Sequence, residues 1–390
     1  MSIAMDRDQA FLDAVRVIAE EVAGPNADTV DRDARFPAET IAALREKQAL
    51  SAFIPTGLGG GGVSFEALAA ACFELGQRCG ASAMVFAMHQ IQVVTIVRHL
   101  DDAPWFESYL RDVAAEQRLI ASVTSEVGTG GDMGRSIASV EPAGDGLGRF
   151  EKQAPTVSYG AHADDLLTTL RRSPEAEPGD QVCVLTRSDQ HTLEPTSSWD
   201  PLGMRGTCSP GNVVRAEFPR EQILPTQFAR VMNESMVPIS HILWSHLWLG
   251  IATDAFARAR AFVRAAAKRK PGEVQPAAIR LSELMSELSL LRAEVSSGLR
   301  EFVDVSAEDR TRLSEMATIL RFNNLKIAAS EQAPRVCQGA LGVCGIMGFK
   351  NDTPFSVGRH LRDTMSACLM VANERIHQTN ASLLLIAKDV

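Results

Sequence analysis

Apolar residues in the first third of the chain recur every three to four positions. One such stripe comprises Phe11, Val15, Ile18 and Val22. This period predicts amphipathic helices. The Gly-rich stretch Gly57–Gly62 interrupts the pattern and favours a turn between helices, because it lacks the Lys-Ser/Thr that ends a phosphate-binding loop. Ser64 is then placed to cap a helix that runs to about Cys79, and a further helix is predicted over Ala83–Leu100.

The middle third has a different pattern, with short apolar runs separated by Gly, Pro, Asp and Ser clusters. The runs that predict strands are Leu119–Thr124, Thr156–Tyr159, Leu166–Leu170, Val182–Thr186 and Asn212–Phe218. Short strands at this spacing are typical of a small antiparallel sandwich or barrel.

The last third returns to the helical period. Long patterns are drawn over 236–267, 275–302, 307–333 and 361–386, and four such helices predict a bundle. Segregated helical and strand zones indicate the α+β class. We therefore predict an N-terminal α-helical domain over 1–117, a middle β domain over 118–225 and a C-terminal four-helix bundle over 226–390.

Composition narrows the class of protein. With 390 residues, 45% hydrophobic and 22% charged, the chain is globular rather than disordered. A diffuse net charge of −9 argues against binding to nucleic acid or to an anionic membrane. The seven cysteines lack any CxxC spacing, which predicts reduced thiols, a cytoplasmic protein and no metal site. The uncharged run Ser235–Thr253 contains Pro, Ser and His, so we expect a buried helix and not a membrane span.

Three segments carry a resemblance to a known family. They are Ile54–Gly60 (IPTGLGG), Val123–Asp132 (VTSEVGTGGD) and Leu202–Thr207 (LGMRGT). Gln338 with Gly342, and the segment Arg359–Asp363 (RHLRD), add to it. By their order and spacing the chain resembles the acyl-CoA dehydrogenase family over essentially its whole length. The resemblance implies FAD as cofactor, a helical domain followed by a β domain and a four-helix bundle, and a homo-oligomer, either dimer or tetramer.

The resemblance also implies a set of flavin contacts. Thr124 and Ser125 match positions that hydrogen-bond the pyrimidine side of the flavin, where such groups stabilise charge on the reduced ring. Gly131 matches a small residue near the flavin phosphates. Thr156 and Ser158 match the segment beside the isoalloxazine, with Thr156 in place of the usual aromatic residue. Taken singly, these hydroxyl residues are more typical of ordinary strand positions. Their shared spacing favours the flavin site.

Further contacts are implied from a neighbouring subunit and from the last helix. Gln338 and Gly342 match an element that the neighbour supplies, and Arg269 is the candidate for the pyrophosphate contact. A basic helix end is an equally good interpretation of Arg269. Asn373 falls where a Thr usually touches the ribose, and Arg375 falls where a Glu or Gln usually sits near the adenine.

The position of the family's catalytic base is the main departure. In the commonest version of the family, the base lies eight residues after the Asp of an Arg-Asp pair. Here that Asp is Asp363, so the corresponding residue is Val371, and valine cannot accept a proton. The nearest carboxylate, Glu374, is displaced by nearly one helical turn and also reads as a solvated residue. His241, on the first helix of the bundle, is a second candidate base. A lone His on an apolar helix is more often a core residue.

Three functions follow from this departure. The first is an FAD-dependent dehydrogenase that oxidises the Cα–Cβ bond of an acyl thioester, on CoA or acyl carrier protein, with an electron-transfer flavoprotein as partner. The alternative is a flavin-dependent monooxygenase or oxidase on the same fold, supplied with reduced flavin by a flavin reductase. Because this chemistry needs no α-proton base, Val371 is expected there. The third is a non-catalytic paralogue that binds flavin or an acyl ligand. The sequence favours the first.

Overall fold

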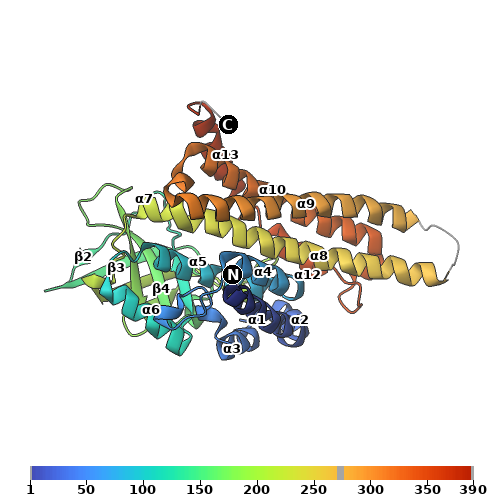
Figure 1. Cartoon of the computed structure of the whole chain (residues 1–390), viewed down its shortest axis with the longest axis horizontal. Helices are drawn as coiled ribbons and strands as arrows, with labels where there is room; N and C mark the ends of the chain where they lie inside the picture. The colour runs from blue at the N-terminus through green and yellow to red at the C-terminus, as the bar shows by residue number, and fades with distance from the viewer. Residues whose placement is uncertain (1, 270–275, 388–390) are drawn as a thin grey trace.

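A computed structural model describes residues 2–269 and 276–387 of the chain. Helices form the N-terminal part, two sheets the middle part and helices again the C-terminal part (Figure 1). The α+β class and the order of the three parts are therefore confirmed. The boundaries after residues 117 and 225 remain predictions. Most of the segment between the helices predicted over 236–267 and 275–302 lies outside the described residues.

The N-terminal part contains six α-helices among the described residues. They are α1 (Ser2–Ile18), α2 (Gly24–Arg32), α3 (Ala38–Glu46), α4 (Phe65–Arg78), α5 (Gly80–His99) and α6 (Pro104–Glu116). The predicted cap of α4 is present, because Ala67 N donates to Ser64 Oγ over 3.1 Å. By length and composition α5 is the one helix of the described part that is apolar enough to cross a membrane, but 89% of that window is buried inside the protein.

The middle part forms two sheets. Its strands are β1 (Ile120–Val123), β2 (Glu141–Pro142), β3 (Leu147–Ala154), β4 (Asp165–Arg171), β5 (Gln181–Arg187), β6 (His191–Pro195) and β7 (Asn212–Pro219). One sheet has the order β1-β4-β5 and the other β2-β3-β7-β6. The expectation of wholly antiparallel sheets is wrong for one pair, since β1 and β4 are parallel.

The predicted strand Thr156–Tyr159 is also wrong. This segment is an irregular turn in which Tyr159 has a φ of 43° and its N–H donates to Thr207 O over 2.8 Å. It therefore pairs with the loop that carries the LGMRGT motif instead of with a strand. In contrast, β3 was missed because it alternates buried positions with exposed charged and polar ones.

The C-terminal part contains α8 (Val237–Arg269), α9 (Pro276–Glu308), α10 (Met316–Cys344), α12 (Gly358–Met365) and α13 (Asn373–Leu384), with single turns α7 (Phe228–Val231) and α11 (Ile346–Phe349). The long helices α8, α9 and α10 lie side by side, and α12 packs against α8 and α10 (Figure 1). The single helix predicted over 361–386 is wrong, because residues 366–372 form turns between α12 and α13. α13 projects away from the bundle (Figure 1).

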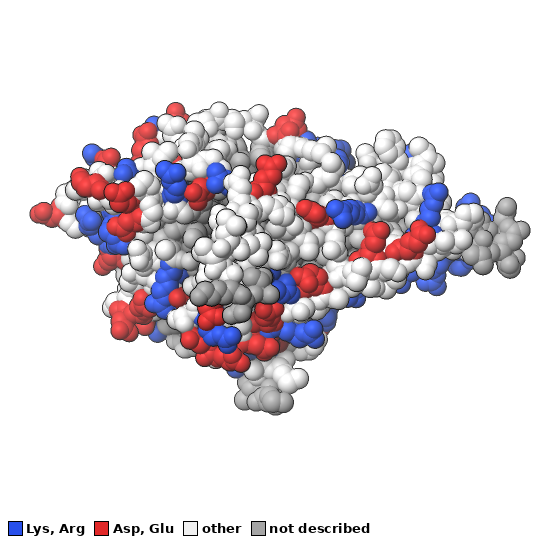
Figure 2. All heavy atoms as spheres, turned by 90° about the horizontal axis from the view of Figure 1, so that it is seen from above, with Lys and Arg blue, Asp and Glu red and all other residues white. Residues whose placement is uncertain are grey.

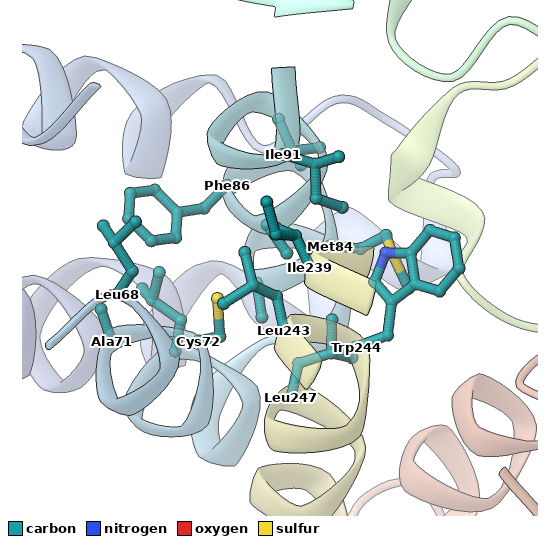
Figure 3. Close-up of a cluster of buried hydrophobic side chains, with 14 of the residues drawn as sticks. Leu68, Ala71, Cys72, Met84, Phe86, Ile91, Ile239, Leu243, Trp244 and Leu247 are labelled. Carbon is teal, nitrogen blue, oxygen red and sulfur yellow. The ribbon is translucent and has the colours of Figure 1, made fainter. Parts of the chain in front are cut away.

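One apolar core joins the N-terminal helices to the bundle. Its centre, drawn in Figure 3, is made by side chains from α4, α5 and α8, among them Leu68, Cys72, Phe86, Ile239 and Leu243. The close crossing of α4 and α8 requires glycine on both helices. A Cβ on Gly76 would lie 2.5 Å from Leu247 O, and one on Gly250 would lie 2.4 Å from Phe73 O. This packing fixes the start of α8 beside α5, where the cavity described below begins.

Charged residues of both signs are interspersed on the surface. Figure 2 shows Lys and Arg mixed with Asp and Glu over the sheet region, with no broad area of one sign on that face. On this face the charged residues of a chain with a net charge of −9 are thus dispersed, as the composition indicated.

Candidate functional site

A cavity of about 620 Å³ lies between α5, the first sheet, the start of α8 and the turn at 366–372. Its lining is largely apolar and rich in methionine, with Met84, Met88, Ile91, Met204, Met236, Trp244, Leu369 and Met370 among the contributors. Flexible thioether side chains adapt to the shape of a bound molecule. The volume and apolar character suit a ligand with an extended aromatic ring.

The five same-chain flavin contacts predicted in the β domain all line this cavity. They are Thr124, Ser125, Gly131, Thr156 and Ser158. Ser125 Oγ donates to Thr156 O over 2.8 Å, so its hydroxyl joins the two segments. The Thr124 hydroxyl has no hydrogen-bond partner among the described residues and lines the cavity, which leaves it available to a ligand. The sequence spacing therefore brought together residues that are up to 34 positions apart, from Thr124 to Ser158.

The loop that follows β1 is built to approach a ligand with its backbone. Gly128, Gly130 and Gly131 have φ values of 91°, 60° and 82°, which disfavour residues with a Cβ. Among the described residues, the N–H groups of Gly130 and Gly131 find no acceptor. The buried carboxylate of Glu126 anchors the loop, since it accepts from Ser136 Oγ and from two backbone N–H groups of the following residues. Free backbone donors in this conformation suit an anionic group.

A chain of hydroxyl groups forms another part of the wall, and sequence reasoning missed it. Thr207 Oγ1 donates to Met204 O and lies 2.9 Å from Ser209 Oγ, which donates to Ser158 Oγ over 2.9 Å. All three hydroxyl residues line the cavity. Thr207 belongs to the LGMRGT motif, and Ser209 follows two residues later. The motif therefore marked the right segment but did not indicate the hydrogen bonds between these hydroxyl groups. These hydroxyls hold Ser158 in place beside the ligand space.

The other predicted cofactor contacts do not line the cavity. Arg269 is exposed at the end of α8, at the tip of the bundle away from the sheets (Figure 1). Gln338 and Gly342 are exposed on α10. A role for these three residues would require a neighbouring chain, so it stays a prediction. Asn373 Oδ1 instead accepts from Lys326 Nζ over 2.6 Å, which attaches the start of α13 to α10.

The turn at 366–372 interrupts the helix that was predicted over 361–386, at the position where the family resemblance places the catalytic base. Val371 lines the cavity with a φ of 45°, a strained conformation for a β-branched residue. Lys326 Nζ, buried on α10, donates to Val371 O over 3.0 Å and holds the turn. The sequence feature that could have indicated this contact is a lone lysine, Lys326, among the apolar positions of a predicted helix.

Neither candidate base has the properties of a strong proton acceptor. The Glu374 side chain is exposed and outside the cavity lining. His241 does line the cavity, and its Nδ1–H donates to Phe322 O over 3.2 Å. Burial, with a smaller contribution from the Lys326 charge, lowers the pKa of His241 to about 3. Asp132 is the one carboxylate among the described lining residues, and its Oδ1 accepts from Gly134 N over 2.9 Å.

We expect Glu374→Gln to leave turnover unchanged within about twofold, because the side chain faces solvent and not the cavity. Steady-state rates of the variant and the wild type, measured with the same substrate and flavin, provide the check. A loss of 100-fold or more would instead require the turn to rearrange and bring this carboxylate inward.

The described residues contain no group of three or more His, Cys, Asp or Glu side chains placed to hold a metal ion. The cysteines of the described chain are all free thiols. Burial raises the pKa of the Cys183 thiol to about 12, which keeps it protonated and unreactive.

Known proteins resemble this chain in both sequence and fold. Residues 5–117 match the family of acyl-CoA dehydrogenase N-terminal domains. A probable acyl-CoA dehydrogenase, YngJ of Bacillus subtilis, is 22% identical over 379 residues, which are 93% of this chain and 94% of that protein. A dibenzothiophene monooxygenase of Mycolicibacterium goodii is 27% identical over 237 residues, or 58% of this chain and 56% of that one.

Solved structures share the fold over nearly the whole chain. FMN-bound TdsC from Paenibacillus sp. A11-2 has a TM-score of 0.82 at 18% identity, covering 96% of this chain and 97% of that one. Butyryl-CoA dehydrogenase from Megasphaera elsdenii has a TM-score of 0.80 at 18% identity, covering 97% and 98%. The matched N-terminal domain, the relative that spans nearly the full length and the solved structures all indicate the same fold. Residues 5–117 therefore match the N-terminal domain of acyl-CoA dehydrogenases, and the chain as a whole has the fold of that family.

Proposed function

We propose that this protein is a flavin-dependent monooxygenase of the acyl-CoA dehydrogenase fold that acts on an apolar substrate. In this reaction one oxygen atom of O₂ enters the substrate, the other leaves as water, and reduced flavin supplies two electrons and two protons. The observation that carries the proposal is the cavity wall at Val371, where a valine in a turn stands in place of a proton-accepting carboxylate. Oxygen insertion needs no α-proton base.

The lining of the cavity supports the same reading. A bound reduced flavin supplies the electrons that activate oxygen, and such chemistry benefits from a site that excludes water. The residues of the chain bind and position the substrate. Methionines and Trp244 provide an apolar surface for the substrate, while Ser158, held by Ser209, offers a fixed hydroxyl in an otherwise apolar wall.

The dehydrogenation of an acyl thioester is the second candidate. It is supported by YngJ, a relative over nearly the whole chain whose name is that of a probable acyl-CoA dehydrogenase, and by His241, whose neutral imidazole lines the cavity. With its pKa lowered to about 3, however, this imidazole is a weak base for an α-proton. The non-catalytic paralogue is the third candidate, and it predicts flavin binding without turnover.

Cofactor and partners follow from the choice of reaction. FAD is the form that the family resemblance implies, and FMN is the alternative, since TdsC binds FMN in its structure. A monooxygenase would take a flavin reductase as partner, whereas a dehydrogenase would take acyl-CoA or acyl-carrier-protein substrates and an electron-transfer flavoprotein. We further propose a cytoplasmic location. A homo-oligomer is supported by the projecting α13 and by the exposed apolar residues at its end, Leu384, Leu385 and Ile386.

Paired assays test the reaction. In the first, the flavin-loaded protein is reduced chemically and mixed with ¹⁸O₂ and a neutral aromatic probe, dibenzothiophene or indole. The proposal predicts a product that carries one ¹⁸O atom. In the second, a panel of acyl-CoA and acyl-carrier-protein thioesters is added to the oxidised protein without oxygen, and the proposal predicts no bleaching of the flavin band. Bleaching without oxygenated product would establish the dehydrogenase instead, and inert flavin in both assays would establish the paralogue.

A further inference from the structure

The start of α8 gives the cavity a wall that is apolar apart from a few polar side chains. Met236, Ser240 and Trp244 lie four positions apart and so share the face that lines the cavity, with His241 beside them. Ser240 Oγ donates to Met236 O within the helix. Trp244 Nε1 is buried without a partner among the described residues, so a ligand in the cavity does not reach it. Figure 3 shows the Trp244 ring beside the apolar cluster that joins α8 to α5.

His241 differs from these residues because one of its ring nitrogens is open to the cavity. The residue is 1% exposed, and its Nδ1 lies 3.2 Å from Phe322 O. Because a carbonyl oxygen only accepts, Nδ1 carries the hydrogen atom and Nε2 of the neutral ring is an acceptor. Nε2 makes no hydrogen bond within the described part of the chain, and it is not among the fully buried polar atoms that lack a partner. His241 thus presents a lone pair that a bound molecule can reach.

The surroundings keep this imidazole neutral. Burial, with a smaller contribution from the Lys326 charge on α10, lowers the pKa of His241 to about 3. Lys326 is itself held in place, since its Nζ donates to Val371 O and to Asn373 Oδ1. At neutral pH the ring therefore offers one fixed acceptor to the cavity, while its N–H group is used by α10.

A fixed acceptor in an apolar wall selects between ligands. An N–H or O–H group placed against Nε2 forms a hydrogen bond, and neither partner is left unpaired. A carbonyl or ether oxygen at the same place brings two lone pairs together and leaves Nε2 without a partner. The acceptor therefore favours one class of ligand and also rejects another.

We propose that His241 Nε2 orients the substrate, and that the substrate is a flat aromatic molecule that carries an N–H or O–H group. The proposal rests on the proposed function and deepens it by naming the substrate class. The methionines and Trp244 of the lining supply the surface for the aromatic ring. His241 then has a role other than proton removal, because its imidazole accepts a hydrogen bond and stays unprotonated.

The test compares indole with benzofuran, which share a shape and present N–H and an ether oxygen at the same ring position. Dissociation constants are measured by equilibrium dialysis against the flavin-loaded, oxidised protein at neutral pH. The wild type should prefer indole, and His241→Phe should reduce this preference by about 5- to 30-fold. A general loss of packing would weaken both ligands alike and leave the preference unchanged. His241→Gln should retain part of it, because its amide oxygen can accept. His246→Phe makes the same change on α8 outside the cavity lining and should keep the wild-type preference.

Equal preference for indole in His241→Phe and the wild type would overturn the proposal, and so would failure of both rings to bind. Flavin dissociation constants of the same variants give a further check. If His241→Phe weakens flavin binding and leaves the preference unchanged, the imidazole contacts the cofactor and not the substrate. The proposed function fails separately, when neither indole nor dibenzothiophene takes up ¹⁸O whatever the preference for indole. Uptake of ¹⁸O without a preference that depends on His241 would retain the reaction and remove this substrate class.

Discussion

Lowering the pH from 7 to 5 should reduce the free energy of unfolding by several kcal/mol. Four buried histidines without a carboxylate partner carry this effect, namely His89, His99, His241 and His246. Burial lowers their pKa values to about 4, 3, 3 and 4, from an ordinary value of 6.5. The unfolded chain therefore binds protons below pH 6.5 that the folded chain cannot bind. Stability is complete above that pH and falls as the pH decreases.

The size of the effect follows from these shifts. Between pH 7 and pH 5 each histidine contributes a loss of about 2 kcal/mol. Asp363 opposes the trend, because burial raises the pKa of its carboxyl to about 6. It gains a proton in the folded state first, which offsets about 1 kcal/mol. His360 differs from these four histidines because its Nε2 lies 2.8 Å from the Asp254 carboxylate.

Urea unfolding at pH 7, 6 and 5 measures this dependence. His246→Leu supplies the matched variant, since His246 lies outside the cavity lining and its Nδ1–H bonds only to Ile242 O in its own helix. On unfolding at pH 5, the variant should take up about one proton fewer than the wild type. A wild-type stability that is flat between pH 7 and 5 would mean that these imidazoles become protonated without loss of the fold.

The parts of the fold that the sequence predicted are those in which local pattern and burial agree. The cap at Ser64 and the strand β4 have clear patterns, and both are present. β3 was missed because a strand with one solvated face carries charged residues at alternate positions. The break between α12 and α13 was missed because the apolar spacing continues through it, whereas the turn is held by Lys326, which is distant in sequence.

The candidate site likewise has a part that the sequence spacing predicted and a part that depends on how distant segments pack. Spacing along the chain was enough to bring Thr124, Gly131 and Ser158 to one cavity. It could not indicate that Ser209 supports Ser158, nor that Arg375 reaches the glycine loop, because both contacts depend on how separate segments pack. The outward positions of Gln338 and Gly342 likewise acquire meaning only in an assembly.

Asp165→Asn should cost about 3–5 kcal/mol of folding free energy, because it breaks a buried ion pair and leaves one charge without its partner. Asp165 is fully buried on β4 and accepts from Arg118 Nε and Nη2, both over 2.7 Å, and from Tyr109 Oη over 2.7 Å. Tyr109 belongs to α6, so the carboxylate joins that helix to the first sheet. The loss also concerns the cavity, since β1 pairs with β4 in parallel and leads directly to Thr124.

Asp180→Asn is the matched control for this substitution. It removes a carboxylate that pairs with Arg172 on the surface, where an exposed ion pair contributes about 0–1 kcal/mol. Chemical unfolding of the two variants at pH 7 should therefore separate them by at least about 2 kcal/mol. Asp165→Asn should also bind riboflavin more weakly, because the end of β1 is less firmly held. If the two variants lose equal stability, then Arg118 is sufficiently stabilised by Glu116 and solvent, and the carboxylate of Asp165 does not hold the helix to the sheet.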